Sequence, residues 1–294
     1  MQLTDIQMRD PFILADELTK RYYLYGTTDV EPWKIQGVSF EAYQSSDLKH
    51  WEGPVTVFKP ESGFWGTHNF WAPEVHVFQD SYYMFASFKS NDHCRGTQIL
   101  VSDSPLGPFR PVSPQPATPL SWECLDGTFF VDDAGQNWIV FCHEWVQVND
   151  GEVCAQRLSE HLDAPIGEPI LLFRASEAPW PKLLARRDGS NLVDARVTDG
   201  PFLHHLEDGQ LLMLWSSVAP NGYAMGYAVS KNGSLLGPWQ QQQEPLITGD
   251  GGHGMIFRSF EGRLYLTYHS PNKTPNERPF FVELEEVEGG LRCR

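Results

Sequence analysis

Three aspartates and one histidine stand just before runs of β-forming residues at matching points along this chain. They are Asp10, Asp126, Asp199 and His253. Carboxyl groups that meet in a small space disfavour joint ionisation, so one tends to keep a proton while another stays charged. Such a pair can protonate a leaving oxygen and activate water, the minimum machinery for cleaving a glycosidic bond. For each aspartate alone, capping of a turn before Pro or Gly is the competing interpretation.

These residues open the units of a fivefold repeat. Each unit has a short apolar run, a polar turn and a second β-rich run, which is the pattern of a β-hairpin. A third β-like run follows every hairpin, and four of the units continue into a further strand-sized segment. The further segments begin near Val55, Phe109, Pro169 and Trp239. The units begin at Asp10, Ala72, Asp126, Asp199 and His253.

Repeats of four short antiparallel strands predict an all-β fold, a five-bladed β-propeller. One blade cannot bury both of its faces, so the blades should stack around an axis as a single domain over residues 1–294. The innermost strand of each blade lines the axis. We therefore expect the first residues of the five repeats to meet at one mouth of the central channel. The long irregular stretch from about 174 to 198 is expected to be a loop, because Pro179 and Pro181 interrupt its pattern.

The charge balance excludes several classes of partner. The chain has 22 basic and 38 acidic residues, a net charge of −16. Nucleic-acid binding needs clusters of Lys and Arg, and the sequence contains no such cluster. An anionic membrane surface would repel this acidic chain. No apolar run is long enough for a transmembrane helix. We therefore expect neither nucleic acid nor membrane as a partner, while the sequence leaves the oligomeric state open.

The start of the chain and its cysteines bear on the compartment. Residues 1–5 lack the basic start and apolar core of a secretory signal, which favours a cytoplasmic protein. The five cysteines are odd in number and form no CxxC pair, so reduced thiols are expected. Aromatic residues make up 13% of the chain and offer faces for stacking on sugars. No Gly-rich phosphate loop or thiol zinc motif competes with glycan chemistry.

Five motifs carry a resemblance to a known family. They are Arg9-Asp10-Pro11-Phe12-Ile13, Trp71-Ala72-Pro73-Glu74, Asp126-Gly127-Thr128-Phe129, Asp199-Gly200-Pro201-Phe202 and Gly252-His253-Gly254. With these motifs in order along essentially its whole length, the chain resembles glycoside hydrolase family 43. That family comprises inverting five-bladed propeller enzymes that act on arabinose- and xylose-containing glycans. Each motif is weak alone, and five in register are specific.

The resemblance implies a catalytic role for each acid. Asp10 corresponds to the general base, and Asp126 to the auxiliary acid that keeps the pKa of the proton donor raised. Asp199 stands where the family usually has a glutamate as general acid. Its side chain is shorter by about 1.5 Å, and a misplacement of about 1 Å can cost ~100-fold in rate. Glu144 follows the second strand of the third repeat and should lie near Asp126, so it is the alternative proton donor; Asp199 is favoured.

Further residues are expected to bind substrate or metal. The predicted substrate contacts are Phe12, His68, Trp71, Trp145 and Arg278. In the family, the histidine matching His253 can hold calcium through water in the central channel; no cofactor is expected to be required. The competing interpretations are structural: packing between blades for the aromatic residues, a salt bridge at the rim for Arg278, and a buried hydrogen bond for His253.

Three functions are compatible with these features. The favoured one is an inverting O-glycosidase, of α-L-arabinofuranosidase or β-xylosidase type, that hydrolyses terminal linkages in plant-type oligosaccharides. The second is a retaining fructan-type hydrolase of the related clan. Glu123-Cys124 resembles a motif of that clan, but its Asn-Asp-Pro-Asn nucleophile motif is missing near the start. The third is a glycan-binding propeller without catalysis. The shortened acid at Asp199 favours it, whereas Asp10 and Asp126 argue against it.

Overall fold

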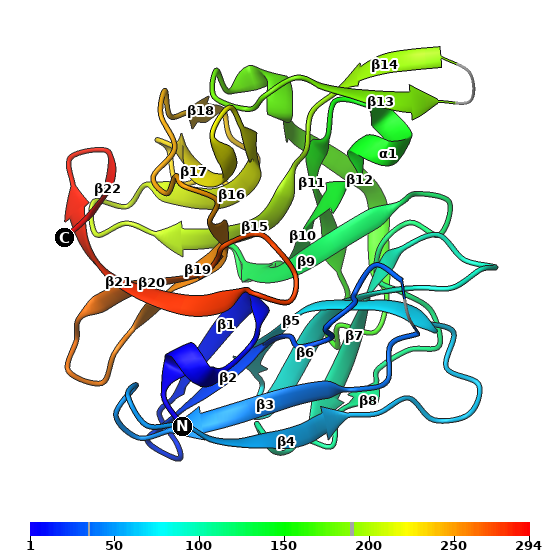
Figure 1. Cartoon of the computed structure of the whole chain (residues 1–294), viewed down its shortest axis with the longest axis vertical. Helices are drawn as coiled ribbons and strands as arrows, with labels where there is room; N and C mark the ends of the chain where they lie inside the picture. The colour runs from blue at the N-terminus through cyan, green and yellow to red at the C-terminus, as the bar shows by residue number, and fades with distance from the viewer. Residues whose placement is uncertain (35, 189–190) are drawn as a thin grey trace.

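The computed structural model describes residues 1–34, 36–188 and 191–294 (Figure 1). It contains five four-stranded antiparallel sheets, each with its strands paired in chain order. The first two blades are β1 (Arg9–Asp16), β2 (Arg21–Thr27), β3 (Phe40–Ser45) and β4 (Glu52–Phe58), then β5 (His68–Phe78), β6 (Ser81–Lys89), β7 (Gly96–Ser102) and β8 (Arg110–Pro111). The third blade is β9 (Cys124–Val131), β10 (Asn137–His143), β11 (Glu152–Leu158) and β12 (Pro165–Arg174).

The last two blades complete the ring. They are β15 (Asp199–His205), β16 (Leu211–Ala219), β17 (Gly222–Ser230) and β18 (Trp239–Gln241), then β19 (Gly252–Arg258), β20 (Leu264–Ser270), β21 (Arg278–Val287) and β22 (Gly290–Cys293). The first strands of the five blades gather around the middle of the molecule (Figure 1). The prediction of an all-β five-bladed propeller is confirmed. The fifth blade also has a fourth strand, β22, for which the sequence analysis found no segment.

The segment between the third and fourth blades is not the loop that we expected. It contains a short 3-10 helix, η2 (Ala175–Glu177), and a separate hairpin of β13 (Leu184–Asp188) and β14 (Asn191–Ala195). Pro179 and Pro181 precede this hairpin, so they do not interrupt the pairing that runs from Leu184 opposite Ala195 to Asp188 opposite Asn191. The expectation was wrong because both prolines lie before the first paired residue.

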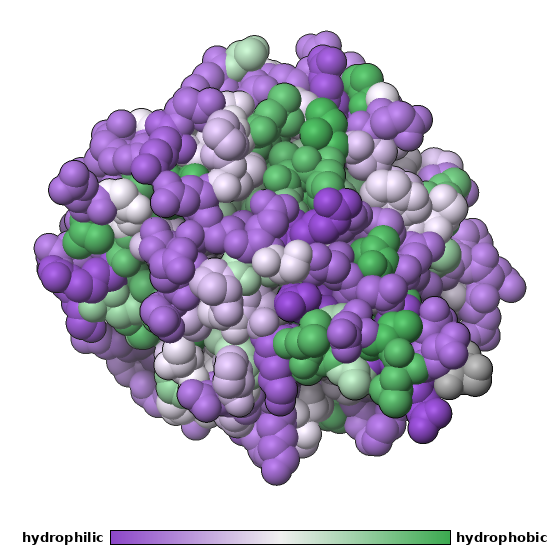
Figure 2. All heavy atoms as spheres, turned by 90° about the horizontal axis from the view of Figure 1, so that it is seen from above, coloured by the Kyte–Doolittle hydropathy of each residue, from purple (hydrophilic) through white to green (hydrophobic). Residues whose placement is uncertain are grey.

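The other helical segments are also short. They are η1 (Leu3–Asp5) and α1 (Trp145–Val148), which begins directly after Glu144. No helix in the described ranges is long and apolar enough to cross a membrane. Seen from above, the surface is mostly hydrophilic, with a few apolar groups between the polar ones (Figure 2).

Aromatic side chains fill the seams between blades. Between the first two blades, the ring of Phe88 lies 4.8 Å from that of Phe70 and 5.7 Å from that of Phe58. On the other side of the ring, Trp180 packs against Trp215 with ring centroids 4.6 Å apart. Much of the aromatic content that suggested sugar stacking is therefore core, which accords with the burial of large apolar side chains.

A buried ion pair joins the first blade to the last. The guanidinium of Arg9 on β1 lies 2.7 Å from Oε1 of Glu277, just before β21, and the Glu277 side chain is fully buried. The hydroxyl of Thr274 donates to the same oxygen, and the Met8 amide donates to the Glu277 carbonyl oxygen at 3.2 Å. Because each blade is built from its own four consecutive strands, no shared strand closes the ring in the described residues; the Arg9–Glu277 ion pair and the Met8–Glu277 backbone bond join its two ends.

Replacing Glu277 with Ala should lower the free energy of unfolding by about 3–5 kcal/mol, since it takes from the buried Arg9 guanidinium the carboxylate to which it is hydrogen-bonded. Chemical denaturation followed by circular dichroism measures this loss. The matched control is Glu283→Ala, which removes a partly exposed ion pair to Arg294 and should cost no more than about 1 kcal/mol. Equal losses in the two variants would contradict a closing role for the Arg9–Glu277 pair.

Candidate active site

A β-bulge interrupts the inner strand of every blade near its start. One residue in each bulge has a left-handed backbone, with φ of 53° at Asp10, 45° at Ala72, 55° at Asp126, 49° at Gly200 and 46° at His253. Such a conformation is uncommon for residues other than glycine, so the surrounding structure must hold it in place. The bulges bring side chains from different blades to one mouth of the channel.

This geometry corrects the repeat alignment at the fourth blade. We expected Asp199 to be equivalent to Asp10, but the left-handed residue there is Gly200. Asp199 lies one position earlier, in the place that Arg9 occupies in the first blade. The motif Gly200-Pro201 matches Asp10-Pro11 and carried this signal, which the alignment on aspartates concealed.

The second strand of the preceding blade holds four of the five bulge amides. The amide of Ala72 donates to Thr27 Oγ1 at 2.9 Å, that of Asp126 to Ser87 Oγ at 2.8 Å, that of His253 to Ser216 Oγ at 2.9 Å and that of Asp10 to His269 Nδ1 at 3.1 Å. The Gly200 amide instead donates to Asp126 Oδ2 at 3.1 Å. Each bulge is therefore positioned by another blade or by an acid of the site.

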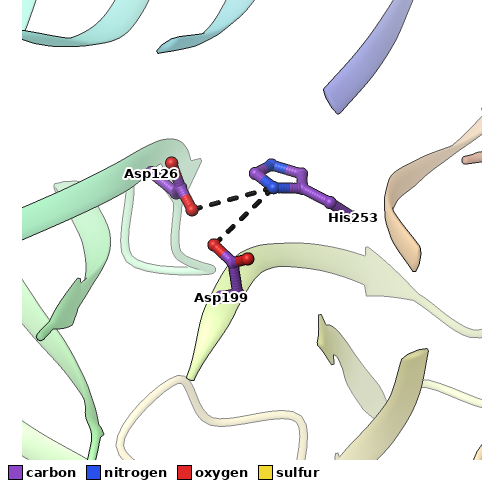
Figure 3. A group of neighbouring side chains, drawn as sticks. All are labelled: Asp126, Asp199 and His253. Atoms are coloured by element: carbon purple, nitrogen blue, oxygen red, sulfur yellow. Dashed lines mark ion pairs between the residues drawn. The ribbon is translucent and has the colours of Figure 1, made fainter. Parts of the chain in front are cut away.

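Three carboxyl groups surround one imidazole nitrogen at this mouth. Nδ1 of His253 lies 3.2 Å from Asp10 Oδ1, and 3.7 Å from both Asp126 Oδ2 and Asp199 Oδ1. Figure 3 shows Asp126 and Asp199 pointing toward the ring of His253 from two different strands. Because Asp10 and Asp199 both reach this nitrogen, their nearest oxygens are at most about 7 Å apart. The two oxygens therefore lie at or below the lower end of the separation of roughly 6.5–9.5 Å that lets water stand between acid and base.

Asp10 is held in its charged form. Burial alone would raise its pKa, but the charges of His253, Arg9 and His269 and the hydrogen bond from Thr27 together lower it by more, and the net shift is downward. The hydroxyl of Thr27 also donates to Asp10 Oδ2 at 2.8 Å. A buried carboxylate that stays ionised next to a place for water is suited to act as a general base.

Asp126 is the acid of the site whose pKa is raised, and Asp199 lies beside it. Burial raises the pKa of Asp126 well above its ordinary value, and the charges of Asp199 and Asp10 raise it further. The side chain of Asp126 is 4% exposed, whereas that of Asp199 is 23% exposed. The buried acid therefore binds its proton more tightly than an ordinary carboxyl group, and the more accessible acid faces outward.

Two residues that the sequence analysis missed complete this network. The hydroxyl of Tyr223 donates to Asp199 Oδ2 at 2.5 Å, and burial, followed by the charge of Asp199, raises the Tyr223 pKa well above its usual value. Burial lowers the pKa of His269 to about 4 although Asp10 opposes the shift, so its ring is neutral at pH 7. Its Nδ1 accepts the Asp10 amide while Nε2 faces Asn272 Oδ1 at 3.3 Å. The repeat alignment contained the signal for His269, which matches Thr27 and Ser216 in position.

A tryptophan from an irregular segment covers the acids. A hollow of about 40 Å³ remains among Arg9, Asp10, Trp33, Trp71, Asp126, Asp199 and His253. Trp33 is 58% exposed, and its ring meets Trp71 edge to face at 4.7 Å. The guanidinium of Arg9 lies 5.1 Å from the Trp33 centroid. The carbonyl oxygen of Pro32 accepts hydrogen bonds from Asn69 Nδ2 and Trp71 Nε1, which anchors this segment. Irregular segments carry no periodic signal, so Trp33 was not predicted.

The predicted substrate contacts separate in the structure. Only Trp71 lines the hollow. Phe12 is buried and lines a cavity toward the other end of the inner strands. His68 is hydrogen-bonded to Thr67, and the Arg278 guanidinium donates to the carbonyl oxygens of Thr4, Pro275 and Glu277. Trp145 is half-buried in α1.

Glu144, the alternative proton donor, lies outside the carboxyl cluster. It forms an ion pair with Arg95, whose guanidinium lies 4.4 Å from the ring centroid of Trp71. Burial raises the pKa of Glu144, and the charge of Arg95 opposes that rise. The arrangement makes Glu144 a support for the wall of the hollow rather than part of its lining.

Calcium at His253 stays a prediction. Asp126, Asp199 and His253 offer ligand atoms that lie within 4.8 Å of one another. Calcium prefers six to eight oxygen ligands, whereas a ring nitrogen stands between the carboxyl groups here. Asp126 is also engaged by the Gly200 amide and Asp10 by the Thr27 hydroxyl. These residues do not present an oxygen cage, and no catalytic step below depends on a metal.

Comparison with known proteins decides the family. The model of "Glycosyl hydrolases family 43" matches residues 4–285. The chain belongs to this family. The resemblance seen in the sequence motifs is thereby confirmed.

Solved structures of similar proteins agree with the family 43 assignment. An endo-arabinase from Bacteroides thetaiotaomicron VPI-5482 is 42% identical with a TM-score of 0.90, and the match covers 99% of this chain and 98% of that one. A thermostable family-43 glycoside hydrolase is 26% identical with a TM-score of 0.79, over 98% of this chain and 93% of its own. Xylosidase/arabinosidase 43A of Humicola insolens is 30% identical over 89 residues, which span 30% of this chain and 26% of that protein.

The shared proton predicts the pH dependence of hydrolysis by this family 43 protein. Activity should persist above the ordinary carboxyl pKa and decline as the pH rises through the raised pKa of Asp126. Asp126→Asn removes the acid whose pKa is raised, and with it the proton that is kept beside Asp199. The alkaline limb of kcat/KM should therefore move downward. A limb that stays in place would show that the two acids do not share the proton.

Proposed function

We propose that this family 43 glycoside hydrolase cleaves arabinofuranosyl linkages in plant-type oligosaccharides with inversion at the anomeric carbon. The observation that carries the proposal is the division of charge around His253. The pKa of Asp10 is lowered on one side, while the pKa of Asp126, beside Asp199, is raised on the other. An inverting glycosidase needs such a base and such an acid on opposite faces of the sugar.

The proposed reaction uses one water molecule. Asp10 accepts a proton from water as its oxygen attacks the anomeric carbon, and the bond from that carbon to the leaving oxygen breaks. Asp199 gives its proton to the leaving oxygen, and Asp126 supplies the proton that Asp199 donates. Tyr223 holds Asp199 in place through its hydroxyl. Return of the Asp10 proton to solvent and reprotonation of the pair complete the cycle.

The choice of substrate rests on similarity and on the small size of the hollow. The protein that is 42% identical over nearly the whole chain is described as an endo-arabinase, which favours arabinose over xylose. The hollow is far smaller than an ordinary ligand pocket of at least about 300 Å³, so Trp33 must shift to admit a sugar ring. Trp33 and Trp71 form a wall of the hollow, which favours binding of a terminal sugar of the glycan. We propose short oligosaccharides in the cytoplasm as substrates.

Endo-cleavage of arabinan is the second candidate, because of the same endo-arabinase relative. Product analysis on linear arabinan separates the two modes. Release of arabinose alone from the start of the reaction supports terminal cleavage, whereas early release of mixed oligosaccharides supports endo-cleavage. Parallel assays with nitrophenyl α-L-arabinofuranoside and β-xyloside test the sugar. Binding of these ligands without turnover would support the non-catalytic alternative.

Replacing Asp10 with Asn should lower kcat about 10²–10⁴-fold while folding and ligand binding persist, because the general base is removed. For the wild-type protein, NMR of the first product anomer should show inversion. Retention of configuration would instead support the fructan-type alternative. Wild-type activity in Asp10→Asn would exclude Asp10 as the base.

A comparison of leaving groups identifies the proton donor. Asp199→Ala should lose far more activity on an arabino-disaccharide than on a dinitrophenyl glycoside, whose leaving group needs little protonation. Glu144→Ala should instead slow both substrates by a similar factor, because it frees Arg95 beside Trp71. The reverse pattern would assign proton donation to Glu144.

A further inference from the structure

The second strand of each blade presents one side chain at a fixed point next to the following blade. This residue pairs across the sheet with the residue just before the bulge. The five residues at this point are Thr27 opposite Arg9, Ser87 opposite Trp71, Cys142 opposite Leu125, Ser216 opposite Asp199 and His269 opposite Gly252. We call them the seam residues.

Four seam residues accept a hydrogen bond from the bulge amide of the next blade. Thr27, Ser87 and Ser216 do so through hydroxyl oxygens, and His269 does so through a ring nitrogen, at distances of 2.8 to 3.1 Å. The fifth, Cys142, is fully buried on β10, and the amide that it would receive belongs to Gly200. That amide donates to Asp126 Oδ2 at 3.1 Å.

We propose that Cys142 is a positioning residue, whose weakly accepting thiol leaves the Gly200 amide free to hold the carboxyl group of Asp126. Sulfur is a weak hydrogen-bond acceptor, whereas the oxygen of a carboxyl group is a better one. The thiol is buried away from the hollow, so it acts on substrate only through Asp126.

The consequence is a fixed spacing between Asp126 and Asp199. Gly200 directly follows Asp199, so its amide ties Asp126 to the backbone that carries the outward-facing acid. A hydroxyl at position 142 would take this amide, as Ser87 and Ser216 take theirs. Asp126 would then lose the hydrogen bond that aims its carboxyl group at Asp199. This inference rests on the proposed function for its kinetic effect, but not for its structural effect.

The test compares two substitutions of Cys142. Cys142→Ser introduces an acceptor and should lower kcat about 10- to 100-fold with little change in KM, as expected when an acid is misplaced by about 1 Å. Cys142→Ala introduces no acceptor, so the kcat of this variant should stay within about threefold of wild type. Its thermal stability should fall, because removal of the buried sulfur leaves a cavity. A residue that mattered only for packing would give the opposite order, because Ala leaves the larger gap.

A control and a structural readout complete the experiment. Cys154→Ser places a hydroxyl at another buried cysteine, on β11, and should leave kcat unchanged. Crystal structures should show the Gly200 amide on the introduced hydroxyl oxygen in Cys142→Ser and on Asp126 in Cys142→Ala. If the amide stays on Asp126 in Cys142→Ser, or if Ala impairs kcat more than Ser, the inference is overturned. Absence of hydrolysis in the wild-type protein would refute the proposed function alone, since the crystal structures still decide the role of Cys142.

Discussion

The site depends on the mutual repulsion of three carboxyl groups that surround a single imidazole nitrogen. Three negative charges within so small a buried space would be costly, so the structure divides them. Asp10 receives the electropositive neighbours, His253 and Arg9, and stays charged. Asp126 is buried beside two acidic neighbours, which raises its pKa and favours its protonated form. Opposite tasks for chemically identical side chains follow from these surroundings, a pattern known from other pairs of catalytic acids.

The bulges of the inner strands are what makes this crowding possible. A regular strand alternates its side chains between the two faces of a blade, and one of those faces is packed against the next blade. A left-handed residue near the start of each strand turns the chain locally toward the channel. The hydrogen bonds from the preceding blade to these residues make the geometry of the site a property of the whole ring.

The sequence predicted the ring because the repeat is periodic. Hairpin patterns recur five times, and the strands near Val55, Phe109, Pro169 and Trp239 are present where expected. The acids at Asp10, Asp126 and Asp199 were found by the same repeat, although Gly200 rather than Asp199 proved equivalent to Asp10. Trp33 was missed because its segment lies outside the repeat, and Tyr223 because the hydrogen bond to Asp199 depends on how two strands meet in space. Phe12 was placed at the wrong end of the channel because alternation along a strand says nothing about a bulge.

The contact between the first and last blades has a further effect on how this protein would respond to heat. Arg9 holds Glu277 with its guanidinium and precedes Asp10 in the chain, so structural closure and the general base share one short stretch of β1. A transient parting of these two blades would displace the base even while the other seams stay closed. Loss of turnover on warming should therefore begin below the temperature at which the β-sheet signal is lost, and it should reverse on cooling while the other four seams remain intact.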